Sequence, residues 1–210
     1  MKSSPTDSET TRDLLERIQS GDSLAAEVLF ASHRDFLRHV LEIRMDRQML
    51  SRVDVSDVIQ ETHLQAVRRL DDFLHRKPMP FRLWLRKMAI ECLLQERRKH
   101  VETKRRSVSR ELPLPDRSSV LLANQALAGT DTPSKLAARK ELAERAHAAI
   151  AQLSEPDREV LLMRNIESLS NQETALALEI EPDAARKRYT RALKRLRDAL
   201  KQQGLSESST

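Results

Sequence analysis

The chain has 210 residues, of which 33% are charged and only 3% are aromatic, and it contains three glycines. This composition, rich in Ala, Leu, Glu, Arg and Lys, favours helices and argues against a β-sandwich or a β-barrel. With so few aromatic residues, the cores must be built mainly from aliphatic side chains. We therefore expect an all-α protein made of two small helical domains joined by a flexible linker.

The formal net charge of +5 and the isoelectric point near 9.6 indicate an anionic partner. The charge is unevenly distributed. Residues 183–201 contain eight basic and two acidic side chains, and residues 95–110 contain seven basic and two acidic ones. Because these segments contribute +6 and +5 to a total of +5, the remainder of the chain carries −6. The sequence thus describes an acidic body with two separate basic segments.

Several chemistries find no support in the residues. Cys92 is the only cysteine, so neither an internal disulfide nor a cysteine zinc cluster can form, and its apolar surroundings are typical of a buried side chain. The six histidines show no metal-ligand spacing, and no glycine-rich phosphate loop or nucleophile–base motif occurs. No apolar run approaches ~18 residues, and the N-terminus lacks a signal-peptide core. We expect a soluble, cytoplasmic protein that is not an enzyme, needs no cofactor or metal and has no membrane partner.

Helical periodicity first extends over residues 10–102, which we take as one domain. Four helices are predicted there: one that stops near Gly21, one over about 24–41, one over about 55–73, and one that starts after Pro80. The side chains expected to face its core include Leu14, Leu15, Leu24, Ala25, Val28, Leu29, Leu37, Val58, Ile59, Leu64, Ala66, Val67, Leu70, Leu83, Trp84 and Met88. Residues 103–134 hold three prolines and scattered Ser and Asp, and we expect them to form the linker.

The second domain is predicted over residues 135–203, with helices at about 135–152, 155–166, 171–178 and 182–202. Local start signals mark the last three helices. Ser154 is placed to cap one helix, and Ser170 with Glu173 forms an S-x-x-E capping box for the next. Pro182 suits the first position of the last helix, where its missing N–H leaves no bond unmade.

The last two predicted helices are joined by about three residues, which is typical of a helix-turn-helix. On the final helix an apolar stripe recurs at steps of three and four residues, formed by Ala185, Tyr189, Ala192, Leu196 and Ala199. Basic residues flank or oppose this stripe, so one side is suited to packing and the other to a DNA duplex. A basic face that is merely solvated, or one that binds a membrane or an acidic partner helix, would have the same charge pattern.

Three segments together resemble the sigma factors of bacterial RNA polymerase. The stretch LSEPDREVLLMRNIESLSNQETALALEIEPDAARKRYTRALKRLRDAL looks like region four of that family. Residues 57–73, DVIQETHLQAVRRLDDF, match the D-x-x-Q-E segment of region two, and residues 81–98, FRLWLRKMAIECLLQERR, match its F-x-x-W-L segment. The short linker leaves no room for a region three, and only a short tail precedes region two. That form resembles the extracytoplasmic-function (ECF) type.

The resemblance implies core RNA polymerase as a partner. Region two of the family grips the clamp helices of the largest subunit, and the matching positions here are Asp54, Asp57, Gln60 and Glu61. Three acids on one helix face repel each other mildly, which suits a face that awaits a basic partner; a solvated acidic face is the alternative. The helix over about 155–166 would meet the flap of the second subunit. Many ECF factors are also held by an anti-sigma factor, although nothing in this sequence identifies one.

The resemblance also implies contacts of both domains with promoter DNA. In region two, the residues placed to contact the minus-ten element are His75, Arg76, Lys77, Arg82, Arg86, Lys87, Arg97 and Arg98. Trp84 occupies the tryptophan position of the family and is expected mainly in the core. In region four, the residues placed to read the minus-thirty-five element are Asp183, Ala184, Arg186, Lys187, Thr190, Arg191 and Lys194. The factor would direct polymerase to specific promoters and assist their opening.

The chain departs from the family at several positions. Glu179 stands where glycine is usual, and Glu181 stands where Ser or Thr is usual; each replacement is expected to weaken the turn, the first by about 1 kcal/mol. Glu91 and Cys92 replace polar residues that are common on the DNA-facing helix of region two. Two other functions stay open from the sequence: a helix-turn-helix regulator that never engages polymerase, and a helical adaptor whose basic segments are only solvated.

Overall fold

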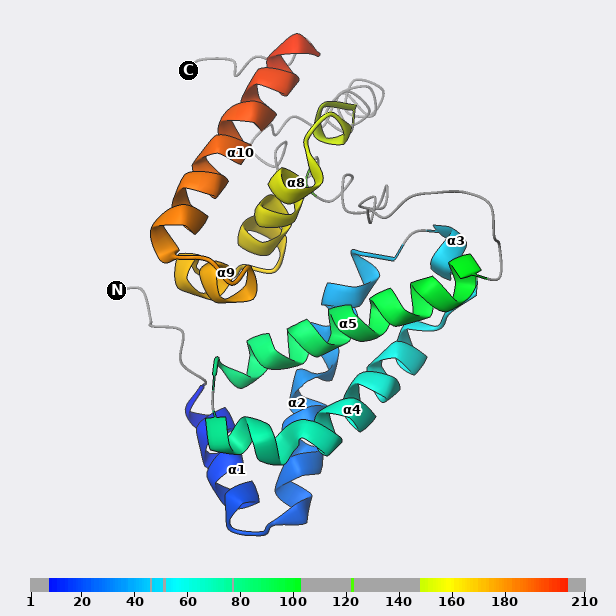
Figure 1. Ribbon diagram of the computed structural model, residues 1–210, viewed down its shortest axis with the longest axis vertical. Coiled ribbons are helices and arrows are strands. Elements are labelled where there is room, and N and C mark those ends of the chain that lie inside the picture. Colours follow the sequence, from blue (N-terminus) through cyan, green and yellow to red (C-terminus); the bar gives the residue numbers. More distant parts are fainter. Residues whose placement is uncertain are drawn as a thin grey trace, which may run out of the picture. The chain divides into compact units, whose positions relative to one another are not determined.

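The computed structural model describes residues 8–45, 47–50, 52–76, 78–102, 122 and 148–203. The chain divides into two compact units, residues 1–108 and residues 109–210 (Figure 1). Over the described residues the secondary structure is helical, which confirms the predicted all-α class. The linker predicted over residues 103–134 lies outside the described residues except for Leu122, and so does most of the helix predicted over 135–152.

The first unit contains α1 (Glu9–Gln19), α2 (Ser23–Glu42), α3 (Arg47–Leu50), α4 (Val55–Arg76) and α5 (Phe81–Glu102). The four predicted helices are confirmed, and the short α3 is an addition that the sequence pattern did not predict. Two of the helices begin at capping side chains. Ser8 Oγ accepts the N–H of Thr11 at the start of α1, and Asp22 Oδ1 accepts the N–H of Leu24 at the start of α2.

The Asp22 cap is also an ion pair. Its Oδ2 lies 2.7 Å from Arg17 Nη2, and the hydrogen bond from Arg17 lowers the pKa of the carboxyl below its usual value of 3.8. Because the pKa of the folded state is depressed, the stabilisation is present at neutral pH and is lost as the pH falls through that lowered pKa. Gly21, with φ at 91°, supplies the left-handed turn that brings α1 and α2 together.

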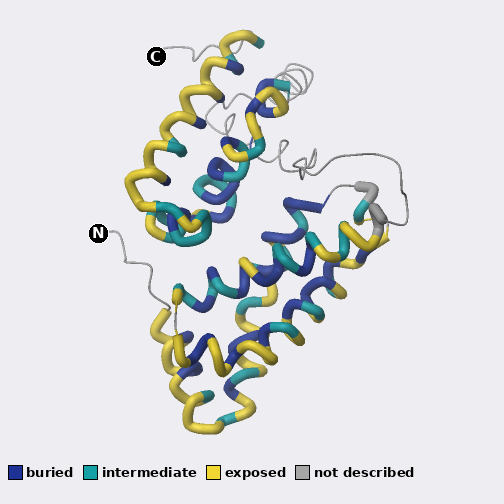
Figure 2. Tube along the Cα trace, in the orientation of Figure 1, coloured by how far each residue is buried: buried dark blue, intermediate teal, exposed yellow. Residues whose placement is uncertain are grey.

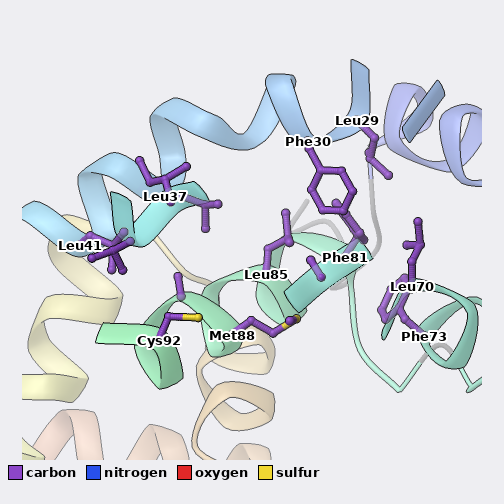
Figure 3. Packing of buried hydrophobic residues seen from close by; sticks show 14 of the residues in the cluster. Leu29, Phe30, Leu37, Leu41, Leu70, Phe73, Phe81, Leu85, Met88 and Cys92 are labelled. Carbon is purple, nitrogen blue, oxygen red and sulfur yellow. The ribbon is translucent and has the colours of Figure 1, made fainter. Parts of the chain in front are cut away.

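The core of the first unit is organised around α5, which packs against both α2 and α4 (Figures 1 and 3). Phe81, fully buried in the first turn of α5, lies 5.7 Å from Phe30 and 5.5 Å from Phe73, measured between ring centroids. The ring centroid of Trp84 lies 4.6 Å from that of Phe73. Trp84 is only partly buried, but it packs against this cluster, as the sequence predicts. Cys92 is fully buried in the same core, and burial raises the pKa of its thiol.

Four side chains expected in this core are exposed instead. Leu24 and Val28 of α2 are 67% and 53% exposed, and Leu64 and Val67 of α4 are 55% and 51% exposed. At about 100° per residue, Leu24, Val28 and Leu64 fall roughly opposite the buried side of their helices, and Val67 falls beside it. The prediction was wrong because it counted apolar residues near the helical period without fixing which stripe faces the neighbouring helices.

The second unit contains α8 (Glu155–Leu161), the π-helical turn η1 (Leu162–Ile166), α9 (Asn171–Ala177) and α10 (Pro182–Gln202). Residues 148–151 are also helical. The three predicted helices at 155–166, 171–178 and 182–202 are thus confirmed, the first as an α-helix that widens into a π turn. Leu122, from the predicted linker, is 3% exposed and packs in the core of this unit with Ile150, Val160 and Leu161.

The end of α9 forms a glycine-free Schellman motif. Glu179 adopts φ of 54°, its N–H donates to the carbonyl of Leu176, and the N–H of Ile180 donates to that of Ala175. The start of α9 has the predicted capping box, with Ser170 Oγ accepting the N–H of Glu173 at 3.1 Å and the Glu173 carboxylate accepting the N–H of Ser170 at 2.7 Å. The turn therefore keeps the geometry that a glycine usually supplies.

Phe81→Ala should lower the free energy of unfolding of the first unit by about 3–5 kcal/mol, because it empties the centre of the aromatic cluster. Urea unfolding followed by the fluorescence of Trp84, the only tryptophan in the chain, would measure this loss. Leu24→Ala is the matched control, since it removes an exposed apolar side chain, and it should change stability by less than about 0.5 kcal/mol. Equal losses for the two variants would contradict the described core.

Glu179→Gly should raise the stability of the second unit by about 1 kcal/mol, because it relieves a left-handed conformation that disfavours side chains. Thermal unfolding followed by circular dichroism would detect the shift. Gln172→Gly, at an exposed right-handed position within α9, is the control and should lower stability by a similar amount. If both glycines destabilise the protein alike, Glu179 is not strained.

Candidate polymerase and nucleic-acid interfaces

The helix-turn-helix is held together at its turn by backbone and side-chain bonds. Glu181 occupies the N-cap of α10 without a side-chain hydrogen bond, in keeping with its low capping propensity. Pro182 takes the first helical position, as predicted. Asn171, the first residue of α9, donates from Nδ2 to the carbonyl of Pro182 at 2.8 Å. The start of α9 is therefore tied directly to the start of α10.

Small side chains let α10 lie close to the rest of its unit. Ala185 and Ala192 are fully buried, and Leu196 and Ala199 are less than 10% exposed, so the predicted stripe is confirmed as the packing side. Two polar bonds flank the stripe. Tyr189 Oη donates to Asn165 Oδ1 of the π turn at 2.9 Å, and Arg195 Nη1 lies 2.6 Å from the buried carboxylate of Asp157 on α8.

The residues predicted to read DNA are all on the other side of α10. Figure 2 shows this helix exposed along one side and buried along the other. The exposed residues include the whole predicted set: Asp183, Ala184, Arg186, Lys187, Thr190, Arg191 and Lys194. Asp183 and Arg186 form a surface ion pair at 3.0 Å, which neutralises part of the charge at the start of the helix. The face is basic and free of large apolar side chains apart from Leu193, which is 39% exposed.

The predicted acidic residues of region two lie at the start of α4. Asp54, Asp57 and Gln60 are exposed, and Glu61 is half-buried. Asp54 has a local role that sequence reasoning missed, since its Oδ1 accepts the N–H of Ser56 at 2.7 Å and so caps the helix. Glu61 accepts a hydrogen bond from Gln65 at 2.9 Å. Within the described part of the chain, Asp57 forms no ion pair, so its charge is free to meet a partner.

A groove of about 350 Å³ runs beside these acids, between α2 and α4. Its floor is apolar and its rims are polar; the lining residues are Glu27, Phe30, Ala31, Arg34, Leu37, Ile59, Gln60, His63 and Leu85. His63 stacks on Phe30 with ring centroids 4.4 Å apart. Of the predicted polymerase contacts only Gln60 lines this groove. The other lining residues were not predicted, because the groove forms only where α2 and α4 meet. The one available signal was that the lining residues of each helix recur at steps of three and four residues.

The predicted contacts to the minus-ten element are scattered along α4 and α5. His75 and Arg76 are exposed in the last turn of α4, where Arg76 pairs with Asp72 at 2.8 Å. Lys87 and Arg98 are exposed and Arg97 is half-buried, whereas Lys77 lies outside the described residues. The guanidinium of Arg82 stacks 4.1 Å above the ring of Phe36.

Arg86 does not fit the expected track of surface cations. It is only 3% exposed, because α5 packs against both α2 and α4 and is covered on more than one side. A buried guanidinium cannot contact a phosphate at the surface, so the expectation for Arg86 is corrected. Further along α5, Lys99 pairs with Glu96 at 2.5 Å, and this hydrogen bond raises the pKa of the lysine.

The described residues contain no group of three or more His, Cys, Asp or Glu side chains that is arranged to hold a metal ion. None of their helices has both the length and the apolar character needed to cross a membrane.

Comparison with known proteins gives consistent matches along both units. The family model for sigma-70 region 2 matches residues 29–103, and that for sigma-70 region 4 matches residues 143–196. RNA polymerase sigma-H factor of Pseudomonas aeruginosa is 27% identical over 194 residues, covering 91% of this chain and 94% of that protein. ECF RNA polymerase sigma-E factor of Escherichia coli is 28% identical over 183 residues, covering 87% and 90% of the two chains.

A solved structure extends the likeness to the fold. The structure of CnrH in complex with the cytosolic domain of CnrY matches with a TM-score of 0.56 and 25% identity, over 92% of this chain and 99% of that one. The two family models together span most of the chain, and the relatives align over nearly their full length. The chain therefore belongs to the sigma-70 family, as an ECF-type sigma factor with regions two and four that binds RNA polymerase and directs it to specific promoters.

Proposed function

We propose that each unit of this sigma factor makes one protein contact and one DNA contact. In region two, the acidic start of α4 and the groove beside it bind the clamp helices of the polymerase, and the basic residues of α4 and α5 bind the minus-ten element. In region four, α10 reads the minus-thirty-five element, and the segment at residues 155–166 meets the flap of the second subunit. The proposal rests mainly on α10, which buries a stripe of alanines on one side and exposes basic side chains on the other.

The polymerase contact rests on charge and shape together. Asp57 and Gln60 are exposed one turn apart, and Gln60 lines a groove whose floor is apolar. Leu64 and Val67 continue along α4 as exposed apolar residues. A helical partner with basic and apolar side chains would bury this apolar surface while neutralising the acids. The exposure of Leu64 and Val67, unfavourable in an isolated protein, is then accounted for.

The double variant Asp57→Arg, Glu61→Arg should weaken binding to core polymerase at least ~100-fold, because it places two cations against a basic partner. Titration of labelled sigma factor with core enzyme would measure the loss. Asp13→Arg with Glu16→Arg is the matched control, since it makes the same charge change on the exposed side of α1. Equal weakening by both variants would point to net charge alone and would contradict the proposed docking face.

The minus-ten contact is assigned to fewer residues than the sequence suggested. We retain Arg76, Arg82, Lys87, Arg97 and Arg98 as the cations available to the DNA strand, together with Lys77 and the imidazole of His75, and we remove the buried Arg86. Their spread along two helices suits a track of phosphates rather than a single pocket.

Arg186→Ala should reduce the preference of the holoenzyme for its own minus-thirty-five element over one altered at a single contacted base pair. An arginine that donates two hydrogen bonds to a guanine favours it over another base by about 1–3 kcal/mol, and an alanine cannot make these bonds. Competition binding with promoter fragments that differ at that base pair would measure the preference. If Arg186→Ala weakens binding to all fragments by the same factor, Arg186 contacts a phosphate and not a base.

Two further parts of the proposal follow from the family. Core polymerase and the promoters share the cytoplasm of a bacterial cell, so we place the protein there. CnrH has been solved with the cytosolic domain of CnrY bound to it. By analogy, we propose that a regulatory protein partner, an anti-sigma factor, also binds this chain. Co-purification of a single protein with the tagged sigma factor, displaced by core polymerase, would support this part.

A further inference from the structure

A second hollow lies on one flank of α10, beside the first residues of α8. It has a volume of about 270 Å³ and is lined by Arg188, Arg191 and Arg195 of α10 together with Ser154, Pro156 and Asp157. The three arginines follow one another at intervals of three and four residues, so their side chains form a row along the helix. Arg188 belongs to none of the contact sets assigned above, and neither does Arg195.

The charges in the hollow do not cancel. Asp157 is its only acid, and its side chain is 6% exposed. Its Oδ2 accepts two hydrogen bonds, from Arg195 Nη1 at 2.6 Å and from Ser154 Oγ at 2.8 Å. Among the residues that the structure describes, Arg188 and Arg191 have no ion pair; Arg191 donates from Nε to the carbonyl of Lys187 at 3.3 Å. Three guanidinium groups facing one carboxylate leave the hollow two positive charges in excess.

We propose that this hollow binds a phosphate of the DNA backbone next to the promoter element, with Arg188 and Arg191 as its ligands, and that Asp157 limits its affinity by withholding Arg195. The inference rests on the proposed reading of DNA by α10. Guanidinium groups fork onto phosphate oxygens, and two in a row suit one phosphate better than a planar base edge. Arg191 borders both the reading face and the hollow, so a duplex on the one brings its backbone toward the other.

Asp157 gives the hollow a property that a plain basic surface lacks. It removes one of three possible phosphate ligands and holds it in an ion pair inside the unit. Weaker binding to the DNA backbone lowers the sequence-independent part of the affinity. Base contacts then contribute a larger share of the total free energy of binding. In this account Asp157 is a positioning residue that acts on specificity through Arg195 and does not touch DNA.

The test measures how promoter binding by the holoenzyme, reconstituted from the full chain and core polymerase, depends on KCl concentration. Each lost phosphate contact reduces the slope of log K against log salt by about 0.9. Arg188→Gln should reduce the slope by this amount and weaken binding equally for all promoter variants. Asp157→Asn should act in the opposite direction, since it frees Arg195 and steepens the slope. Lys201→Gln, which removes a cation of α10 outside the hollow, should leave the slope unchanged.

Several results would overturn the proposal. An unchanged slope for Arg188→Gln would do so, and so would an equal change for Lys201→Gln. If Asp157→Asn does not fold, Arg188→Lys can be tested in its place. Lysine keeps the positive charge but not the forked guanidinium, so this variant should preserve the salt slope and lower the affinity for DNA. Stabilisation of the protein by inorganic phosphate that depends on Arg188, without any change in slope, would identify a small-anion site instead. If the wild-type holoenzyme fails to select a promoter at all, the proposed function itself is wrong.

Discussion

The DNA-facing architecture of the second unit depends on the close packing of α10 through small side chains. Ala185 and Ala192 are fully buried, so the helix backbone lies nearly against its neighbours and no bulky side chain tilts it away. The bonds from Tyr189 to Asn165 and from Arg195 to Asp157 fix the helix along its length. With one side occupied in this way, the long basic side chains have only the solvent side available. Enlarging either alanine would overpack the contact and move the reading face.

The turn between α9 and α10 shows how the same geometry is reached without glycine. A Schellman motif closes α9 although its left-handed position is occupied by Glu179, and Pro182 takes the first position of α10. The strain of one residue is offset by hydrogen bonds on both sides of it. Glu181 adds no cap of its own. The two glutamates therefore weaken the turn locally and leave the path of the chain unchanged.

Features that depend on local sequence were predictable. Helix starts at Ser154, Ser170 and Pro182 follow from side chains within one turn, and the stripe on α10 follows from a single helical period. Features that depend on how helices meet were not. Arg86 is buried because both α2 and α4 pack against α5, and the groove near Gln60 exists only where α2 and α4 lie side by side. The burial of Leu122 in the second unit likewise needs a distant partner surface.

The central claim is that one chain joins a polymerase-binding unit to a DNA-reading unit and thereby sets the start of transcription. Run-off transcription with purified protein, core polymerase and promoter fragments selected from a random library tests this directly. The account predicts discrete transcripts that require the sigma factor and disappear when the selected upstream element is scrambled. Specific DNA binding without any transcript would contradict it and would favour a regulator that does not engage polymerase.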